Sequence, residues 1–159
     1  MAWRGSTTVK DRIFASLPYL LPIIYALPFG MSLFQQFPAL GLILLPLQPV
    51  LFIYRSLGPF AGIIIFFLLF FLVVRNERIL HFIRFNTMQA ILIDIALVLC
   101  NLVWQYMLQP LGANLLTETL LNVVFLATLV ACGYSIVQSL LGRYAEIPAI
   151  SEAVYAQVR

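Results

Sequence analysis

Apolar residues occur in this chain in long runs, and the charged residues gather between those runs. Four runs, at about 13–34, 59–74, 85–108 and 119–141, are candidates to cross a membrane. A hydrocarbon layer of roughly 30 Å needs about 20 apolar helical residues, and each run reaches or comes close to that length. The pattern therefore predicts an all-α, polytopic membrane protein with four transmembrane helices.

Prolines make the first third of the chain irregular, since seven of the nine fall at or before Pro59. Three of them, Pro18, Pro22 and Pro28, interrupt the first run. Proline removes a backbone donor and bends a helix, and a membrane helix tolerates it where neighbouring helices satisfy the released carbonyl groups. We therefore expect a kinked first span that packs against other helices.

The stretch 37–54 between the first two runs is apolar and nearly long enough to cross. It is broken into short pieces by four residues: Pro38, Gly41, Pro46 and Pro49. Irregular backbone at membrane depth must be covered by protein. This segment is expected to be re-entrant or interfacial, without crossing the membrane.

Composition agrees with a membrane protein. Hydrophobic residues make up 63% of the 159 residues and charged residues 9%, and the mean hydropathy is +1.02. A soluble domain carries nearer about 25% charged residues. The length allows a single membrane domain, 1–159. The net charge is +3, and the basic residues stand at the ends of apolar runs, where they orient and anchor helices. Membrane lipid is the expected partner, and nucleic acid is not.

Counting Lys and Arg predicts which segments share a compartment. Three segments are basic: the N-terminus (Arg4, Lys10, Arg12), the connector before the third run (Arg75, Arg78, Arg84) and the tail (Arg143, Arg159). The loop 109–118 has neither residue type. The positive-inside rule places both termini and the connector in the cytoplasm or stroma. An even number of crossings must then precede residue 75, and a cysteine at Asn114 should be labelled from outside.

The start of the chain shows no cleavable targeting segment, because residues 1–12 are too short and lack a cleavage pattern. We therefore expect synthesis on the side of insertion, as in a bacterium or in an organelle that encodes the chain. At the other end, the tail 142–159 turns polar. Its apolar residues Ile147, Ile150, Val154 and Val158 recur at helical spacing, and Pro148 is well placed to start a helix. This spacing predicts an interfacial amphipathic helix.

The third run carries a polar side, made of Thr87, Asp94, Asn101 and Gln105. Residues seven apart lie on nearly the same side of a helix, and unpaired polar groups are costly against lipid. We therefore expect this stripe to face other helices or a wet pathway.

Asp94 is the one ionisable residue deep in a predicted span, and two interpretations stay open. It is either a proton- or cation-linked site or pathway lining, or a carboxyl group that fixes helix packing through Tyr25, Asn122 or Tyr134. Because no second buried acid or lysine accompanies it, the structural role is favoured.

The beginning of the third run offers candidate contacts with a partner or with lipid. These are the connector arginines Arg75, Arg78 and Arg84, together with Asn86 and Gln89, for which helix capping is the simpler account. His81 stands alone, and the two cysteines make no metal or disulfide spacing. No catalytic motif is present, so we expect neither an enzyme nor a cofactor.

Three stretches together are similar to a known family. They are Arg84–Ala90 (RFNTMQA), Gly133–Ser135 (GYS), and the tail, which reads GRYAEIP from Gly142 and SEAVY from Ser151. In order and spacing they resemble the twenty-kilodalton subunit family of the chloroplast inner-envelope translocon, the Tic complex, and its cyanobacterial relatives. The resemblance extends from the region of Leu17 to the tail.

The resemblance implies a four-helix membrane protein that, in plastids, helps to form the preprotein-conducting part of the import machinery. It also implies membrane-protein partners of a translocon-like complex and a preprotein substrate. Without a transit peptide, the chain is expected to be a cyanobacterial or plastid-encoded member, in a cyanobacterial membrane or the plastid inner envelope. Two alternatives stay open: a membrane scaffold or assembly factor, and a small-solute or ion transporter that uses Asp94.

Overall fold

The computed structural model describes residues 6–159, and Arg4 of the basic N-terminal segment lies outside them. Within this range the structure is helical and contains no strand. Four helical segments are long and apolar enough to cross a membrane: Val9–Gln36, Pro38–Val74, His81–Leu111 and Leu115–Leu140. The predicted all-α membrane protein with four spans is confirmed.

The first span consists of three α-helical pieces, α1 (Val9–Ser16), α2 (Leu20–Ala26) and α3 (Met31–Gln36). Two 3-10 turns join them, and Pro18 and Pro28 stand at the beginning of those turns. Proline fixes φ and lacks a donor, so the helix changes its winding at these points. The predicted interruption of the first span by proline is therefore present.

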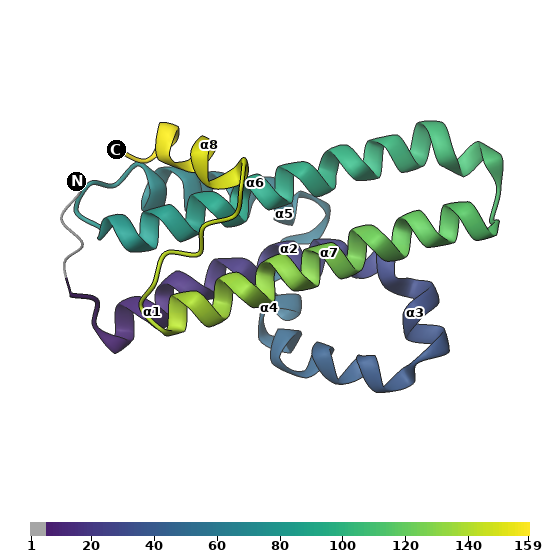
Figure 1. Cartoon of the computed structure of the whole chain (residues 1–159), viewed down its shortest axis with the longest axis horizontal. Coiled ribbons are helices and arrows are strands. Elements are labelled where there is room, and N and C mark those ends of the chain that lie inside the picture. The colour runs from purple at the N-terminus through teal and green to yellow at the C-terminus, as the bar shows by residue number, and fades with distance from the viewer. Residues whose placement is uncertain (1–5) are drawn as a thin grey trace.

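The second span is bent. A 3-10 turn (Pro38–Ile43) leads into α4 (Leu44–Leu57), which ends at Gly58 with φ of 68°. A short turn then leads to α5 (Ala61–Leu69), which ends in a π-helical turn, Phe70–Val74. Figure 1 shows α3 and α4 leaving one side of the bundle before α5 returns along α6.

This second segment has 37 residues and would measure about 55 Å as a straight helix, more than the hydrocarbon layer. The bend at Gly58 shortens it. The stretch 37–54 is helical over most of its length. That this stretch does not cross the membrane stays a prediction.

The last two spans form a long antiparallel pair (Figure 1). α6 (His81–Val103) continues into a π-helical turn, Trp104–Leu108, and α7 runs over Leu115–Leu140. Asn114 caps α7, because its side chain accepts the backbone N–H of Thr117. A final helix, α8 (Ile150–Gln157), lies on the first half of α6.

The first span forms the core of the bundle. Its most apolar window is 56% buried, against 11%, 17% and 22% for the three spans that follow. Gly30 permits its closest contact with α7, because a Cβ atom there would lie 2.7 Å from the ring of Phe125. The other spans surround this centre and expose most of their apolar surface to the hydrocarbon layer or to other chains.

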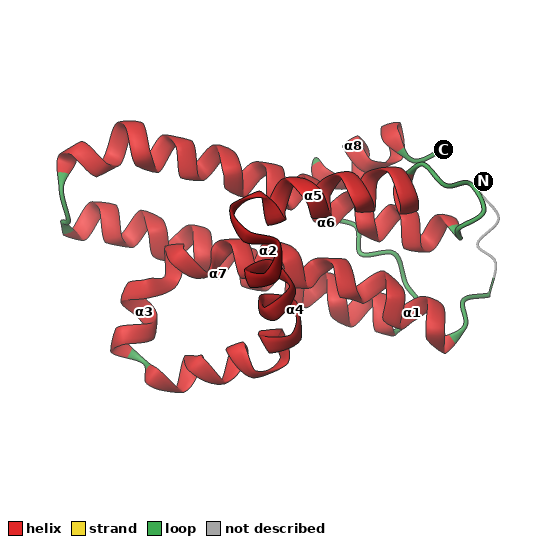
Figure 2. Cartoon of the chain, turned by 180° about the vertical axis from the view of Figure 1, so that it is seen from behind, coloured by secondary structure: helices red, strands yellow, loops and turns green. Residues whose placement is uncertain are grey.

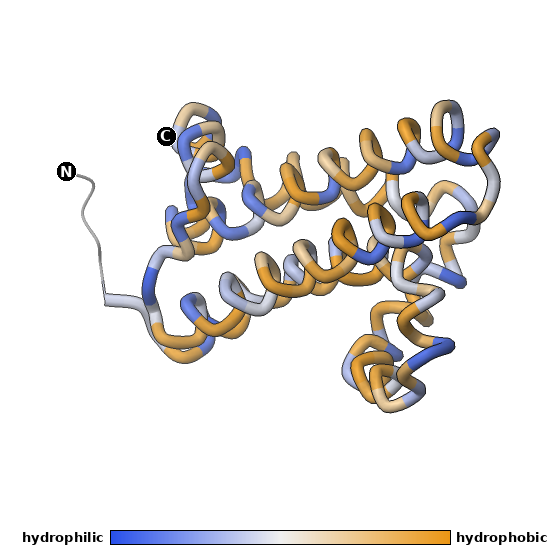
Figure 3. Tube along the Cα trace, turned by 45° about the vertical axis from the view of Figure 1, so that its right-hand side comes forward, coloured by the Kyte–Doolittle hydropathy of each residue, from blue (hydrophilic) through white to orange (hydrophobic). Residues whose placement is uncertain are grey.

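The beginning of α1, the C-terminus and the connector between α5 and α6 lie at one end of the bundle, opposite the loop before α7 (Figure 2). Figure 3 shows hydrophilic positions gathered at this end and at the opposite loop, with hydrophobic helices between them. This placement agrees with the predicted even number of crossings before residue 75. The compartment that faces this end stays a prediction.

The tail forms the predicted helix, α8, and its apolar side packs onto protein. Val154 and Val158 are 0% and 2% exposed, in one cluster with Val74, Phe85 and Met88. Packing against α6 and Val74 thus removes the apolar side of the tail from water, and contact with lipid is not needed for that.

Candidate functional site

A cluster of buried polar side chains joins α6 to the rest of the molecule. Its members come from the first span, α6, α7 and the tail: Tyr19, Asn86, Gln89, Ser135, Ser139 and Ser151. Asn86 Oδ1 accepts hydrogen bonds from the hydroxyl groups of Tyr19 (2.7 Å) and Ser139 (3.0 Å). Its Nδ2 donates to the carbonyl of Phe82 at 2.8 Å. Both ends of the Asn86 amide are therefore satisfied inside the bundle.

Gln89 extends this cluster to the tail. Its Nε2 donates to the Tyr19 hydroxyl at 3.0 Å and to the carbonyl oxygen of Ala145 at 2.8 Å. Its Oε1 accepts from the hydroxyl of Ser151 at 3.0 Å. Since a buried polar group without a partner is costly, this amide holds the first span, α6 and α8 in one arrangement.

Asn86 and Gln89 were expected at a partner or lipid surface, or as caps of the third span. In the structure both are 0% exposed, and α6 has no side-chain cap. The difference arises because the first span and the tail cover this side of α6. In this fold the two amides hold the chain's own elements together.

The three connector arginines separate into two kinds. Arg84 is 8% exposed, and its guanidinium group donates to the carbonyl oxygens of Val74 (2.8 Å) and Arg159 (3.1 Å). Arg75 and Arg78 are exposed at the same end of the molecule. Arg84 therefore ties the connector to the tail, and contact of Arg75 and Arg78 with lipid or a partner stays a prediction.

A second site lies farther along the spans, in a cavity of about 950 Å³ between α2, α4, α5 and α6. Its wall is largely apolar and includes four polar side chains: Tyr25, Tyr54, Asp94 and Asn101. Ile63 and Phe67 of its rim are 60% and 49% exposed. The cavity therefore reaches the outer, lipid-facing side of the bundle.

Asp94 brings the cavity its one carboxyl group. Its Oδ1 is buried and has no hydrogen-bond partner within the described chain. Of the partners considered from sequence, Tyr25 lines the same cavity, whereas Asn122 accepts a bond from Ser32 and Tyr134 is 44% exposed. A carboxyl group in such surroundings requires a proton, a cation or a donor from outside the chain.

The predicted polar stripe of α6 does not form one surface. Asp94 and Asn101 face the cavity, and Gln105 is exposed near the loop before α7. Thr87 is 0% exposed, and its hydroxyl oxygen has no partner among the described residues. The stripe passes from the core to the outside because the packing around α6 changes along its length.

Sequence reasoning missed five residues of these sites. Four belong to the buried cluster, namely Tyr19, Ser135, Ser139 and Ser151, and Tyr54 lines the cavity. Each carries a hydroxyl group and lies in a segment that was interpreted only from its apolar pattern or its turn signals. A search for polar residues within apolar runs finds Tyr19 and Tyr54 as candidates, but not the residues they meet.

The fold and the two sites define a multi-pass, α-helical membrane protein, tied together by buried amides and hydroxyl groups and open at one side. The family model described as "Chloroplast import apparatus Tic20-like" matches residues 8–154. The chain belongs to this Tic20-like family.

Curated relatives come from cyanobacteria, plants and red algae. A "Tic20 family protein" of Synechocystis sp. is 55% identical over 100% of this chain and 99% of its own length. "Protein TIC 20-II, chloroplastic" of Arabidopsis thaliana is 33% identical over 96% of this chain and 74% of its own length. "Tic20 family protein Ycf60" of Gracilaria tenuistipitata var. liui is also 33% identical, over 95% of this chain and 76% of its own.

Proposed function

We propose that this protein is a membrane-embedded subunit of a Tic-type preprotein translocon, in which it contributes part of the conducting path. The family description names the chloroplast import apparatus, and relatives carry the TIC 20 name. This role is not enzymatic. We place the chain in a cyanobacterial membrane or the plastid inner envelope, with both termini in the cytoplasm or stroma.

The single observation that supports this role most is the cavity beside Asp94, which opens to the side of the bundle. A lone chain bounds the cavity with α2, α4, α5 and α6, and leaves the rim exposed. Another copy or another membrane protein would complete the wall. We therefore propose that the path forms between chains, with Asp94 and Asn101 on its surface.

The partly polar wall suits a passing polypeptide. Tyr54 and Asn101 can exchange hydrogen bonds with a peptide backbone, and the apolar remainder accommodates varied side chains without strong binding. Arg75 and Arg78 are the proposed contacts with other subunits or with lipid. Both are basic and exposed, and they lie at the end of the bundle that holds the C-terminus.

A second function is supported by the buried amide cluster. The bonds of Asn86 and Gln89 hold four segments in a fixed arrangement, as expected for a scaffold or assembly factor. In that case the Asp94 cavity would be filled by lipid or by a partner helix and would stay dry. A third candidate function is a transporter that uses Asp94 alone, and the Asp94 Oδ1 without a partner in the described chain favours it.

Water access separates a conducting path from a dry scaffold. In a background with Cys100 and Cys132 replaced by alanine, single cysteines are placed at Asn101 and at Leu99 and treated with a membrane-impermeant thiol reagent. Leu99 is the matched control, because it lies two residues away and is 57% exposed on the outer side. Labelling at Asn101 alone supports the path, since only a hydrated thiol ionises and reacts. Equal protection of both contradicts it.

Contact with a preprotein separates a translocon from an ion transporter. A photoreactive residue replaces Tyr54 in membranes that carry the intact complex and an arrested preprotein. Phe52 is the control, because it lies on the same helix and is 72% exposed. Adducts to the preprotein from position 54 and not from position 52 support the proposal. Adducts from neither position, with arrest verified independently, overturn it.

A further inference from the structure

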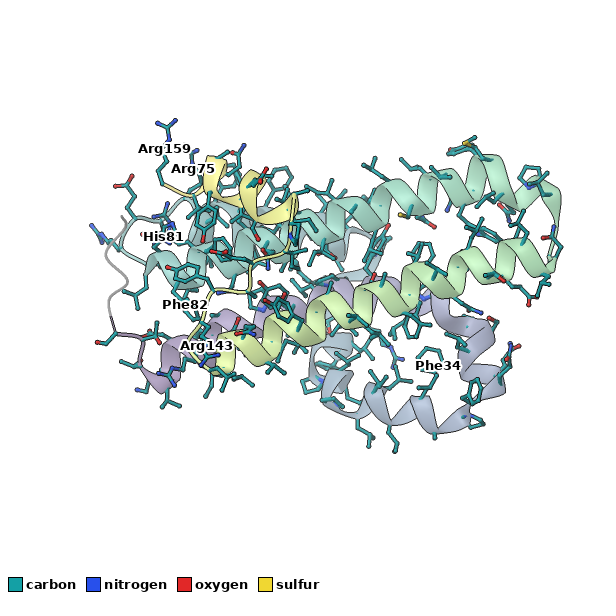
Figure 4. All side chains as sticks on the ribbon, viewed as in Figure 1. Phe34, Arg75, His81, Phe82, Arg143 and Arg159 are labelled. Carbon is teal, nitrogen blue, oxygen red and sulfur yellow. The ribbon has the colours of Figure 1, made fainter. Side chains whose placement is uncertain are left out.

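A polar cavity of about 620 Å³ lies at the end of the bundle that holds the beginning of α1 and the C-terminus. It is formed by the beginning of α1, the beginning of α6 and the segment that follows α7. Its polar side chains are Ser6, Thr7, Arg12, His81, Arg143, Tyr144 and Glu146. The volume falls within the range of roughly 300–1,000 Å³ that is typical of small-ligand sites. Figure 4 shows His81, Phe82 and Arg143 together in this region.

Arg12 is held in position by the chain around it. Its Nε donates to the hydroxyl of Thr7 at 3.2 Å. Its guanidinium group lies against Gly142, where an added Cβ atom would be 2.8 Å from Nε and 2.9 Å from the Thr7 oxygen. Gly142 also has φ of 75°. The glycine thus leaves room for the arginine, and the terminal nitrogens of Arg12 make no hydrogen bond within the described residues.

The cavity carries more cationic than anionic groups. Arg143 is exposed, and neither it nor Arg12 pairs with a carboxylate of the described chain. Glu146 is the one acid in the lining, and its Oε1 accepts the hydroxyl of Tyr155 at 3.0 Å. Both ring nitrogens of His81 face partners, the Tyr144 hydroxyl and the Val158 carbonyl. The two guanidinium groups are therefore the donors that remain for an oxyanion.

We infer that the cavity lies at the depth of lipid headgroups, because its two arginines stand at the ends of apolar runs. Arg12 comes directly before the apolar run of the first span, and Arg143 comes just after the apolar end of α7. Next to them, Ile13 and Leu141 are 46% and 55% exposed. Arginines at the ends of spans meet the headgroup layer, and exposed apolar residues beside them meet acyl chains.

We propose that this cavity binds the anionic headgroup of a membrane lipid, with Arg12 and Arg143 as the oxyanion ligands. A phosphodiester or a sulfonate has the required chemistry, since either presents charged oxygens to two guanidinium groups. The neighbouring Ile13 and Leu141 favour a lipid over a free phosphate ion. The site is separate from the Asp94 cavity and does not depend on the proposed translocon role.

The test compares two double variants that each remove two positive charges from the same end of the molecule. Arg12→Gln/Arg143→Gln changes the cavity, and Lys10→Gln/Arg159→Gln, at two exposed residues outside the lining, is the matched control. Binding of phosphatidylglycerol, with phosphatidylcholine as the uncharged reference, is measured by native mass spectrometry of the full chain. We expect the cavity variant to lose about tenfold in phosphatidylglycerol binding and the control less than about twofold. Equal losses mean diffuse surface attraction and overturn the proposal.

Two further arms keep the proposal falsifiable. Arg143→Gln alone, at an exposed side chain, should preserve the melting temperature and still lose about threefold in binding. Unchanged binding in this folded variant overturns the role of Arg143. Millimolar inorganic phosphate should leave the bound lipid in place. Displacement of the lipid by phosphate would mean a site for the free ion, and would overturn the lipid assignment.

Discussion

At the residue scale, the buried amides and the Asp94 carboxyl group differ in whether their polar atoms have hydrogen-bond partners inside the span. Gln89 has hydrogen-bond partners on both ends of its side chain, from three other segments. Asp94 has a buried oxygen with none within the described chain. A satisfied group holds structure together, whereas an unsatisfied one is a candidate for binding. The two residues therefore predict different outcomes on substitution.

Gln89→Leu keeps the side-chain volume and removes its hydrogen bonds. We expect a loss of about 1–3 kcal/mol in the free energy of unfolding, because the Ala145 carbonyl and the Ser151 hydroxyl lose a buried partner. Thermal unfolding in detergent measures it. Gln105→Leu, at an exposed position of the same segment, is the control and should change little. Equal effects of the two substitutions would show that the cluster does not stabilise the fold.

Asp94→Asn tests the structural role favoured from the sequence. Because the buried Oδ1 makes no hydrogen bond in the described chain, we expect the melting temperature to stay within about 2 °C of the unmodified protein. Assembly into complexes, followed by native electrophoresis, should also persist. Loss of fold or assembly would instead mean that the carboxyl group is a packing element.

At the element scale, proline and glycine shape the first half of the molecule. The 3-10 turns at Pro18 and Pro28 let the first span follow the surface of α7, and Gly30 permits the closest approach. Gly58, with φ of 68°, ends α4 and redirects the chain into α5. Each irregularity thus serves a contact or a bend that a continuous helix does not provide.

Gly30→Ala should weaken the packing of the first span on α7. A Cβ atom would lie 2.7 Å from the buried ring of Phe125, and such overpacking typically costs about 1–3 kcal/mol. Gly62→Ala is the control, since nothing lies within 4 Å of its Cβ position. Thermal unfolding compares them. Phe125→Leu should partly restore the stability of Gly30→Ala, and failure to do so would contradict the proposed clash.

At the scale of the whole molecule, the beginning of α1, the C-terminus, the connector and the cavity beside Arg12 lie at one end. The first span occupies the centre, and the three others present apolar surface outward. A chain of this shape is incomplete as a conduit, because its Asp94 cavity opens at the side. Assembly with other chains is the expected working state.

Orientation is tested with an impermeant thiol reagent on intact, oriented membrane vesicles lacking the native cysteines. Asn114 caps α7, so the outer cysteine is better placed at the exposed neighbour Ala113. We expect labelling at Ala113 from outside, and labelling at Asn76 of the connector only after permeabilisation. The reverse pattern would invert the proposed orientation.

The sequence by itself determined the class of protein, the four spans and the family. These depend on the lengths of apolar runs, the positions of Lys and Arg, and motifs such as residues 84–90, all of which are local.

Only the tertiary structure decided which polar groups meet. Asn86 and Gln89 became internal connectors because Tyr19, 67 residues away from Asn86, packs across α6. The stripe from Thr87 to Gln105 divided because its neighbours change along the helix. The burial of a side chain depends on segments distant in sequence, and no periodicity within one helix encodes those partners.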